Sequence, residues 1–476
     1  MSVNNLFDPL FQPRTIAVVG ASATNVSGGN RYIKNLQAFG YQGQIWPIHP
    51  KAQEIEGLKA YASLADTPDQ IDYLYVAVNA TLVVDVLRSA RGRVKIAQVM
   101  SSGFSETEGG RDLERQLLDT AREVGVRVIG PNCLGAYSPK GKVTFTAKAD
   151  PAIGRVAVLS QSGGLGVDII RRGKNRGVKF AGVVTVGNCT DVKPWEVIQY
   201  FLENPDVDVI GLYLETAMGG RELFETLRFA KLSKPVVLLK GGATRQGQLA
   251  ALSHTGALAG SDTAWNALAK QTGLARVNSL NQFIDTLVMM QSVKPSTQPT
   301  ERIILFGNGG GASVLGTDAF GRFGFDLVEL APSATDRLNA LALPPGSSVL
   351  NPIDVPAGAL QQDEGRIAEK ILQSIIGVPG VAIVIHINMT VVLSFKHVDM
   401  LGNLVKAVMR VKKERPDQHV LLVLRSDGDP EVEEKKRAHM CSVVEAGIPV
   451  FHELDDAAAA LASLRAIERH AISIKD

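Results

Sequence analysis

The sequence predicts an α/β fold made of three doubly wound domains in series. A chain of 476 residues with 45% hydrophobic and 21% charged residues is typical of a globular protein that is too large for a single core. Short, continuously apolar segments recur along the chain, and helix-length segments separate them. Continuous rather than alternating hydrophobicity favours strands covered on both faces, as in parallel sheets with βαβ crossovers.

The first expected domain covers residues 1–145. Its strands are expected at residues 15–22, 43–50, 73–79, 96–103 and 126–132. Residues 139–154 contain turn-forming residues and show weak periodicity, which is typical of a linker.

The same pattern then repeats twice. The second expected domain covers residues 146–295, with strands at 155–164, 180–188, 207–215 and 234–242. A helical stretch from about Ser261 to Met290 follows, and a second linker is expected at 293–301. The third expected domain covers residues 300–476, with strands at 302–311, 326–332, 381–388, 419–428 and 448–454.

The composition disfavours several classes of protein. The formal charge of +2 and the lack of a basic block disfavour a nucleic-acid partner. No segment reaches the roughly 18–20 continuous apolar residues that a membrane span needs. The three cysteines cannot build a disulfide framework and lack the paired spacing of a zinc site, so a reducing compartment, the cytoplasm, is expected.

A candidate nucleotide-binding turn, VVGASATNVSGGN (18–30), follows the first expected strand. Doubly wound folds place a phosphate-binding turn there. Gly20 is followed by Ser22 rather than by a second glycine, so the turn differs from the dinucleotide fingerprint. The second strand ends in His-Pro-Lys, and Lys51 suits a phosphorylated ribose, as in NADP or the 3′-phosphate of coenzyme A. A glycine-bearing turn without a nucleotide is the alternative.

Two further turns, SSGFSE (101–106) and GPNCLG (130–135), follow later strands and are expected to line the same crevice. Their candidate contact residues are Ser102, Gly103, Asn132 and Cys133. A catalytic thiol at Cys133 is disfavoured relative to a buried packing role, because no histidine lies near it in sequence.

The second domain begins with a strand that runs into the Ser/Gly turn of VAVLSQSGGLG (156–166) and then into a helix. Such a turn directs several backbone N–H groups and the helix dipole at one point, which favours phosphate binding. Helix capping alone is the alternative. The candidate phosphate-binding residues are Ser160, Gln161, Ser162, Gly163 and Gly164.

Glu215 and His254 follow neighbouring strands and are expected at the same edge of the sheet. A buried carboxylate needs a partner, and a Glu215–His254 hydrogen bond would fix the imidazole tautomer and stabilise its cationic form. The small residues Gly256, Ala257, Ala259 and Gly260 leave space around a nucleophilic nitrogen. A satisfied structural histidine is the alternative. A metal site is not expected, because no second ligand lies at a suitable spacing.

Five motifs in this order resemble one family. They are GAS (20–22), GPNCLG (130–135), LSQSGGLG (159–166), LYLE (212–215) and SHTGALAGSD (253–262). Together they are similar to the α subunit of the nucleoside-diphosphate-forming acyl-CoA synthetases, which include the ADP-forming acetate–CoA ligases and, more distantly, succinyl-CoA synthetase. The resemblance extends from about residue 7 to the end of the chain.

The resemblance implies roles for these residues. His254 would be the phosphohistidine, Glu215 the carboxylate that supports it, and the turn at 160–164 the phosphate site. The first, Rossmann-like domain would bind coenzyme A. The third unit, with GNGGGAS (307–313) and NPIDV (351–355), would be a second flavodoxin-like ligase domain.

The resemblance also implies a partner. Many members carry an ATP-grasp domain of about 200 residues, and the three expected domains leave no room for one here. A separate ATP-grasp β subunit would then hold ATP or ADP and Mg²⁺, in a hetero-oligomer such as α2β2. The substrates would be coenzyme A, phosphate and a small carboxylic acid that no residue specifies. A regulatory module that binds coenzyme A without turnover is the alternative, and an NADP-dependent oxidoreductase is disfavoured by the first turn.

Overall fold

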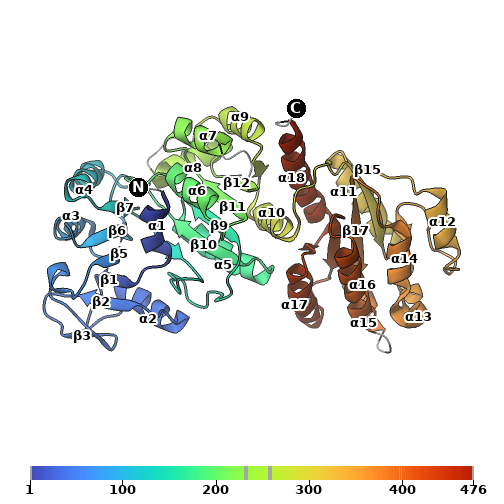
Figure 1. The fold of residues 1–476 in the computed structure, drawn as a ribbon, viewed down its shortest axis with the longest axis horizontal. Helices are drawn as coiled ribbons and strands as arrows, with labels where there is room; N and C mark the ends of the chain where they lie inside the picture. The colour runs from blue at the N-terminus through green and yellow to red at the C-terminus, as the bar shows by residue number, and fades with distance from the viewer. Residues whose placement is uncertain (1–2, 230–233, 256–259, 396, 398, 474–476) are drawn as a thin grey trace. The chain divides into compact units, whose positions relative to one another are not determined.

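The computed structural model describes residues 3–229, 234–255, 260–395, 397 and 399–473 (Figure 1). The chain divides into two compact units. One contains residues 1–174 and 179–278, and the other contains residues 175–178 and 279–476. Three main sheets, which are parallel apart from one edge strand, confirm the α/β class; two lie in the first unit and one in the second.

The first sheet has the strand order β2-β1-β5-β6-β7, and all of its strands are parallel. The strands are β1 (Thr15–Val19), β2 (Gln44–Ile48), β5 (Ile71–Val76), β6 (Val94–Val99) and β7 (Arg127–Ile129), and a small hairpin joins β3 (Glu54–Ile55) to β4 (Leu58–Lys59). Apolar residues of α3 (Ala80–Arg88) and α4 (Arg111–Val124) pack on one face of the sheet, whereas α1 (Val3–Phe11) and α2 (Gly28–Phe39) pack in a separate core cluster. This coverage of both faces explains the continuous hydrophobicity of the strands.

The second sheet has the order β13-β12-β11-β9-β10-β8. Its strands are β8 (Gly135–Tyr137), β9 (Val156–Ser160), β10 (Phe180–Thr185), β11 (Val209–Leu214), β12 (Val236–Lys240) and β13 (Ala275–Val277). Its helices are α5 (Gly163–Asn175), α6 (Pro194–Glu203), α7 (Gly220–Phe229), α8 (Arg245–Thr255) and α9 (Asp262–Thr272). The core of α1 and α2 continues into this sheet, which explains why the two sheets form one unit.

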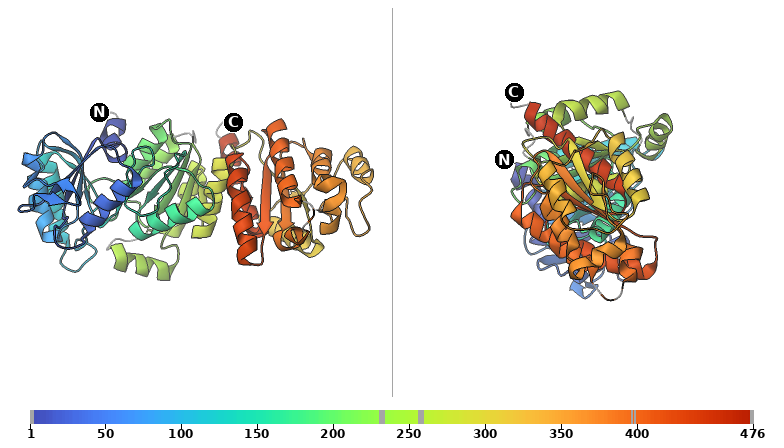
Figure 2. Two further views of the ribbon diagram at one scale, coloured as in Figure 1. Left: turned by 90° about the horizontal axis from the view of Figure 1, so that it is seen from below. Right: turned by 90° about the vertical axis from the view of Figure 1, so that its right-hand side faces the viewer.

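The third sheet has the order β15-β14-β17-β18-β19, with β16 paired to β14. Its strands are β14 (Arg302–Gly307), β15 (Asp326–Leu327), β16 (Ile353–Asp354), β17 (Val381–Asn388), β18 (Val420–Arg425) and β19 (Val450–Phe451). Helices α11 (Gly310–Arg322) and α18 (Leu454–Ser473) pack against each other on one face, and α14 (Ile367–Ile375) and α16 (Met400–Glu414) pack on the other (Figures 1 and 2). The remaining helices of this unit are α10 (Leu280–Ser292), α12 (Pro332–Asn339), α13 (Gln362–Gly365), α15 (Met389–Ser394) and α17 (Pro430–Glu445).

The structure differs from the sequence-based expectation in two places. The stretch expected to be helical from Ser261 to Met290 is two helices separated by β13, because Gly273 ends α9 in a left-handed conformation at φ 70°. An unexpected strand, β8, pairs antiparallel with β10.

Helix α10 belongs to the same compact unit as the third sheet and packs against α18. The division at 1–145, 146–295 and 300–476 stays a prediction.

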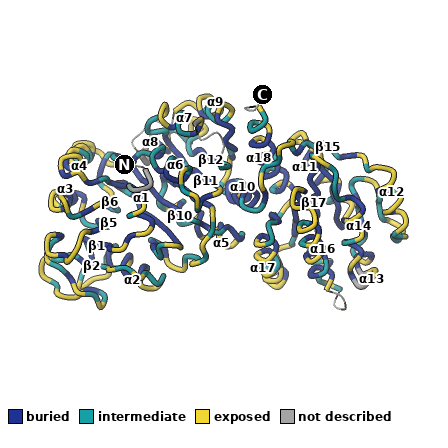
Figure 3. Tube along the Cα trace, viewed as in Figure 1, coloured by how far each residue is buried: buried dark blue, intermediate teal, exposed yellow. Residues whose placement is uncertain are grey.

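The long central strands are buried along most of their length (Figure 3). Polar groups at the strand ends are therefore the ones that can meet a ligand. Within the residues that the structure describes, no helix is both long and apolar enough to cross a membrane.

Candidate functional site

Three glycine-rich turns, at 18–30, 160–164 and 307–313, lie at equivalent positions of the three sheets. In each sheet the first strand of the α/β pattern, β1, β9 or β14, has its next strand on one side and a later strand on the other. This reversal of strand order creates a crevice at the carboxyl end of that strand, where open α/β sheets bind ligands. The turns that follow Val19, Ser160 and Gly307 each lie at such a point.

The turn after β1 depends on Gly20, whose φ is +99°. A Cβ atom at this position would overlap the carbonyl oxygen of Ala77, so the close approach of the two strand ends requires glycine. Ser22 closes the turn, because its Oγ accepts from the N–H groups of Thr24 and Asn25 at 3.2 Å. Lys51 is exposed beyond the end of β2. These candidate contacts thus occupy the crevice edge of the first sheet.

The turns at 101–106 and 130–135 lie side by side, because the N–H of Asn132 donates to the carbonyl of Ser101 at 2.9 Å. Ser102 is exposed, and Asn132 is half-buried with φ +58°. Cys133 is 2% exposed, and burial raises the pKa of its thiol to about 12. A thiol with this pKa holds almost no thiolate at neutral pH, which favours the packing role for Cys133.

The strand register of the second sheet aligns the carboxyl ends of neighbouring strands at one edge of the sheet. Ser160 at the end of β9 pairs with Thr185 of β10 on one side and with Tyr213 of β11 on the other. Lys240 at the end of β12 pairs with Leu214, one residue before Glu215. The turn at 160–164, which the sequence predicts to bind phosphate and which is called the phosphate turn below, therefore shares one edge of the sheet with Glu215.

Both serines of the phosphate turn shape its backbone. Ser160 is fully buried, and its hydroxyl donates to the carbonyl of Ser162 at 2.7 Å. The hydroxyl of Ser162 accepts from the N–H of Leu165 at 3.3 Å and caps α5. The first N–H groups of a helix have no acceptor within it. A Cβ atom on Gly164 would meet no atom within 4 Å, so the space in front of this helix end is open.

Gln161 links the phosphate turn to Glu215. Its Oε1 accepts from the backbone N–H groups of Glu215 and Thr216, the latter at 2.9 Å, and its Nε2 donates to Thr216 Oγ1 at 3.0 Å. Glu215 is 6% exposed, and its Oε1 accepts from the hydroxyl of Tyr213 at 3.0 Å. Burial raises the pKa of Tyr213, and the nearby Glu215 carboxylate raises it further, so Tyr213 stays a hydrogen-bond donor. This network fixes the carboxylate at the sheet edge.

Lys240 is a buried cation next to this carboxylate. It is 6% exposed, and its Nζ lies 5.3 Å from the centre of the Trp265 ring and donates to the carbonyl of Gly241. Burial and the positive charge of Arg276 lower its pKa to about 8, although Glu215 acts in the opposite direction. The site thus contains a positive charge that the sequence analysis did not include.

His254 lies, by its backbone, in the last turn of α8. Its side chain and residues 256–259 lie outside the described residues. The expected Glu215–His254 hydrogen bond is therefore not part of the description. Helix α8 follows β12, the strand next to β11, so the chain order and the sheet order both bring α8 to the edge where Glu215 lies.

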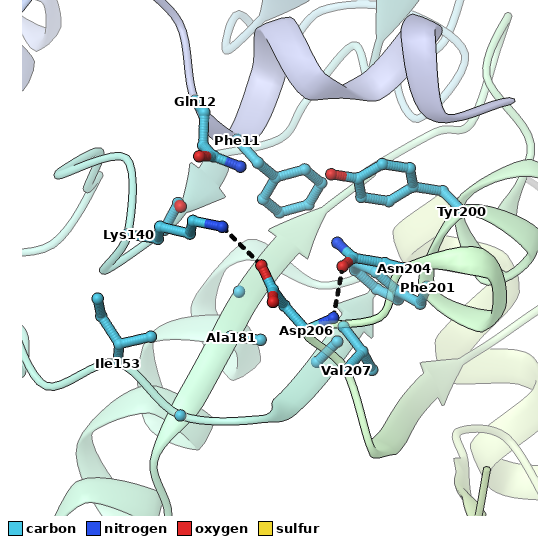
Figure 4. A pocket seen from close by; sticks show the side chains of 14 residues that line it. Phe11, Gln12, Lys140, Ile153, Ala181, Tyr200, Phe201, Asn204, Asp206 and Val207 are labelled. Carbon is cyan, nitrogen blue, oxygen red and sulfur yellow. Dashed lines mark hydrogen bonds and ion pairs between the residues drawn. The ribbon is translucent and has the colours of Figure 1, made fainter. Parts of the chain in front are cut away.

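A small cavity lies at the opposite, amino-terminal edge of the second sheet (Figure 4). It measures about 30 Å³, space for one or two water molecules. The rings of Phe11 and Tyr200 stack at 5.4 Å along it, and Lys140 pairs with Asp206 at 2.6 Å. Its two charged side chains pair with each other and its volume is small, so we assign no chemistry to it.

Several site residues were missed in the sequence analysis. Asn188, Glu106 and Glu114 form a polar cluster between the first and second sheets. Asn188 and Lys240 each stand at the end of a very apolar segment, which is the signal that identified Glu215. Glu106 and Glu114 gave no comparable signal, because their partner comes from a distant part of the chain.

Comparisons with known proteins agree with this geometry. Residues 14–139 match a family described as a CoA binding domain, and residues 153–290 match a family described as a succinyl-CoA ligase-like flavodoxin domain. The α subunit of acetate–CoA ligase (ADP-forming) I from Pyrococcus furiosus is 31% identical over 465 residues, 96% of each chain. The α subunit of isoenzyme II from the same organism is 32% identical over 468 residues.

This chain belongs to the ADP-forming acetate–CoA ligase family. The resemblance inferred from the five motifs is therefore confirmed. A solved structure of the family, acetyl-coenzyme A synthetase 1 from Ca. Korarchaeum cryptofilum in complex with phosphate and ADP, superposes with a TM-score of 0.84 at 29% identity, over 98% of both chains.

Other members of the ligase family are longer. The ADP-forming acetate–CoA ligase of Methanocaldococcus jannaschii is 34% identical over 345 residues, which are 72% of this chain but 48% of that protein. About half of that protein thus lies outside the match. Within the part of the chain that the structure describes, no group of three or more His, Cys, Asp or Glu residues could hold a metal ion.

Proposed function

We propose that this chain is the α subunit of a nucleoside-diphosphate-forming acyl-CoA synthetase. The reaction would interconvert acyl-CoA, ADP and phosphate with a carboxylic acid, coenzyme A and ATP. The observation that supports this most directly is the shared sheet edge, on which Gln161 of the phosphate turn holds the backbone of Glu215. Full-length similarity to α subunits of this class agrees with it.

The chemistry would proceed in three steps. A phosphate oxygen attacks the thioester carbon, the C–S bond breaks, and the thiolate of coenzyme A takes up a proton. A ring nitrogen of His254 then attacks the phosphorus of the acyl phosphate, and the carboxylate leaves. The phosphoryl group finally passes from His254 to the terminal phosphate of ADP.

The residues of this chain would position and stabilise these groups. The N–H groups that open α5 and the buried cation Lys240 favour the charged phosphoryl group, because phosphoryl transfer depends mainly on positioning and charge stabilisation. The Glu215 carboxylate would stabilise the cationic imidazole of His254. The crevice of the first sheet, with Gly20, Ser22, Lys51, Ser102, Gly103, Asn132 and Cys133 as candidate contacts, would hold coenzyme A.

The nucleotide would bind on another chain. The two Pyrococcus relatives are named as α subunits, and the match to the longer Methanocaldococcus relative covers 48% of that protein. We propose an ATP-grasp β subunit that supplies the site for ATP or ADP and Mg²⁺, in a hetero-oligomer such as α2β2.

The proposal is tested by phosphorylation of the chain. The complex with its ATP-grasp partner is incubated with Mg²⁺ and ATP labelled with ³²P at the γ-position. We expect label on the wild-type chain that is lost in acid and stable in base, as for phosphohistidine, and none on His254→Ala. His439→Ala, a histidine on α17 outside the site, is the matched control and should remain labelled.

An unlabelled wild-type chain beside a partner that hydrolyses or exchanges ATP would contradict the proposal. Coenzyme A binding without any label would then favour a regulatory module of the same fold.

A further inference from the structure

Asn188 joins the two sheets of the first compact unit through its side chain. It follows β10 and is 7% exposed. Its Nδ2 donates to Glu106 Oε2 at 2.7 Å and to Glu114 Oε2 at 2.9 Å. Its Oδ1 accepts from the side-chain Nδ2 of Asn132 at 3.5 Å. One amide thus bridges two carboxylates of the first domain and a candidate coenzyme A contact.

The two carboxylates also accept hydrogen bonds from backbone N–H groups of the turn at 101–106. Glu106 Oε1 accepts from the N–H groups of Gly103 at 2.6 Å and Phe104 at 3.2 Å. Glu114 Oε2 accepts from the N–H of Ser105 at 3.0 Å. Burial acts to raise the pKa of Glu106, but the hydrogen bonds from Asn188 and Gly103 outweigh it and hold this pKa below its usual value. Both groups can therefore keep their local turn even without Asn188.

Backbone contacts beside Asn188 reinforce the junction. The N–H of Asn188 donates to the carbonyl of Pro131 at 3.0 Å, and the N–H of Thr190 donates to that of Gly130 at 3.1 Å. A Cβ atom on Gly187 would overlap the carbonyl oxygen of Pro131, so the two segments are in close contact. The segment Gly187–Thr190 is thus fixed against the turn at 130–135.

The other side of this segment faces the phosphate turn. Gln161 Nε2 lies 3.6 Å from Cys189 Sγ, and Gln161 also accepts from the backbone N–H of Glu215. The Nζ of Lys193 donates to the carbonyls of Cys189 at 2.7 Å and Thr190 at 2.9 Å. A continuous set of contacts therefore leads from Gly103 through Asn188 and Gln161 to Glu215.

We propose that Asn188 is a positioning residue that holds the coenzyme A crevice in register with the phosphate turn. The inference rests on the proposed function. It assigns to the Asn188–Glu106–Glu114 cluster the placement of the acyl thioester, held by the first sheet, against the phosphate held by the second. Asn188 would act through Glu106 and Glu114 and would not touch the reacting atoms.

The key variant is Asn188→Asp, which keeps the size of the side chain but replaces its donor by a third carboxylate. Local turns of Glu106 and Glu114 persist, so coenzyme A should bind with a Kd within about threefold of wild type in calorimetry. The two sheets lose their polar link, so acyl transfer from acetyl-CoA to inorganic phosphate should slow at least tenfold. Release of free coenzyme A in the complex with the partner subunit measures this rate.

Two further variants make the result specific. In the double variant Asn188→Asp with Glu106→Gln, the new amide at position 106 can donate to the new carboxylate at position 188, and one negative charge is removed. Its transfer rate should therefore be at least threefold higher than that of Asn188→Asp alone. Asn204→Asp is the matched control. Asn204 lies at the opposite edge of the second sheet, where its Oδ1 accepts from the N–H of Asp206 at 2.9 Å, and an aspartate preserves that bond (Figure 4).

The outcomes separate the two proposals. A transfer rate in Asn188→Asp equal to wild type, or a loss of coenzyme A affinity equal to the loss of rate, overturns the positioning role. A folded double variant without recovery also overturns it. A wild-type complex that releases no coenzyme A from acetyl-CoA or from any other thioester of a panel of aliphatic and aromatic acyl-CoAs contradicts the proposed function itself and removes the basis of this inference.

Discussion

Gly164→Ala tests whether phosphate binds at the amino-terminal end of α5. Every Cα–Cβ bond in a helix is tilted toward the helix N-terminus, so the added methyl group points toward the expected anion. The methyl group would meet no protein atom within 4 Å. Its effect on the protein alone is therefore favourable, because alanine replaces glycine in a helix.

The two effects have different magnitudes and opposite signs. Gly→Ala in a helix contributes up to about 1 kcal/mol of stability. A hydrogen bond to a charged group contributes roughly 1.5–3 kcal/mol, so losing one between the helix end and phosphate should raise the KM for phosphate by about 10- to 150-fold. The KM for coenzyme A should change much less, since its expected crevice lies on the first sheet.

Initial rates of acyl-CoA phosphorolysis at varied phosphate measure the KM, and a thermal melt measures stability. Gly321→Ala is the control, because this helical glycine of α11 also has no atom within 4 Å of the added methyl group. It should change stability alone. A stable Gly164→Ala variant with a wild-type KM for phosphate would refute the placement of phosphate at this turn.

Three other predictions concern buried groups. Glu215→Gln should lower phosphorylation of the chain at least tenfold and leave the Kd for coenzyme A unchanged in calorimetry; an equal loss of both would indicate a folding defect. Cys133→Ala should keep kcat within about threefold, because burial raises the pKa of this thiol to about 12, and complete inactivation would restore the catalytic-thiol alternative. Burial and Arg425 lower the pKa of His386 from 6.5 to about 3, so the unfolded chain takes up a proton that the native site rejects. The stability that this histidine gives above pH 6.5 is lost as the pH falls, at roughly 1.4 kcal/mol per pH unit. Between pH 7 and pH 5, the free energy of unfolding measured in urea should fall by about 2 kcal/mol less for His386→Asn than for wild type. An equal fall in the two proteins would contradict this.

The strand pattern determined the fold class. Continuous apolar segments separated by helix-length segments require strands covered on both faces, and parallel sheets with crossover helices satisfy this requirement. The spacing of apolar segments in the sequence predicted the long strands better than the short ones. Strand β13 has three residues, Ala275–Val277, and its place in the sheet depends on pairing with β12 rather than on its own pattern.

The motifs also located the polar ends of individual strands. Glu215 and the turn at Ser160–Gly164 stood out because polar residues directly follow apolar strands, and the register of β9 and β11 puts them at one edge. The direction of a parallel strand is enough to place such residues, so local sequence contains this information.

Only the tertiary structure decided how these ends combine. The sequence separates Glu106 from Asn188 by 82 residues, and no local pattern indicates that these two side chains meet. Their hydrogen bond exists because a continuous core holds the first and second sheets together, with the turn at 130–135 against Gly187–Thr190. The environment of Lys240 was likewise not readable from sequence, since its lowered pKa depends on burial next to Arg276 and beside Trp265. The sequence thus determined the strands, their polar ends and the family, whereas packing between distant segments determined the charge and the alignment of the site.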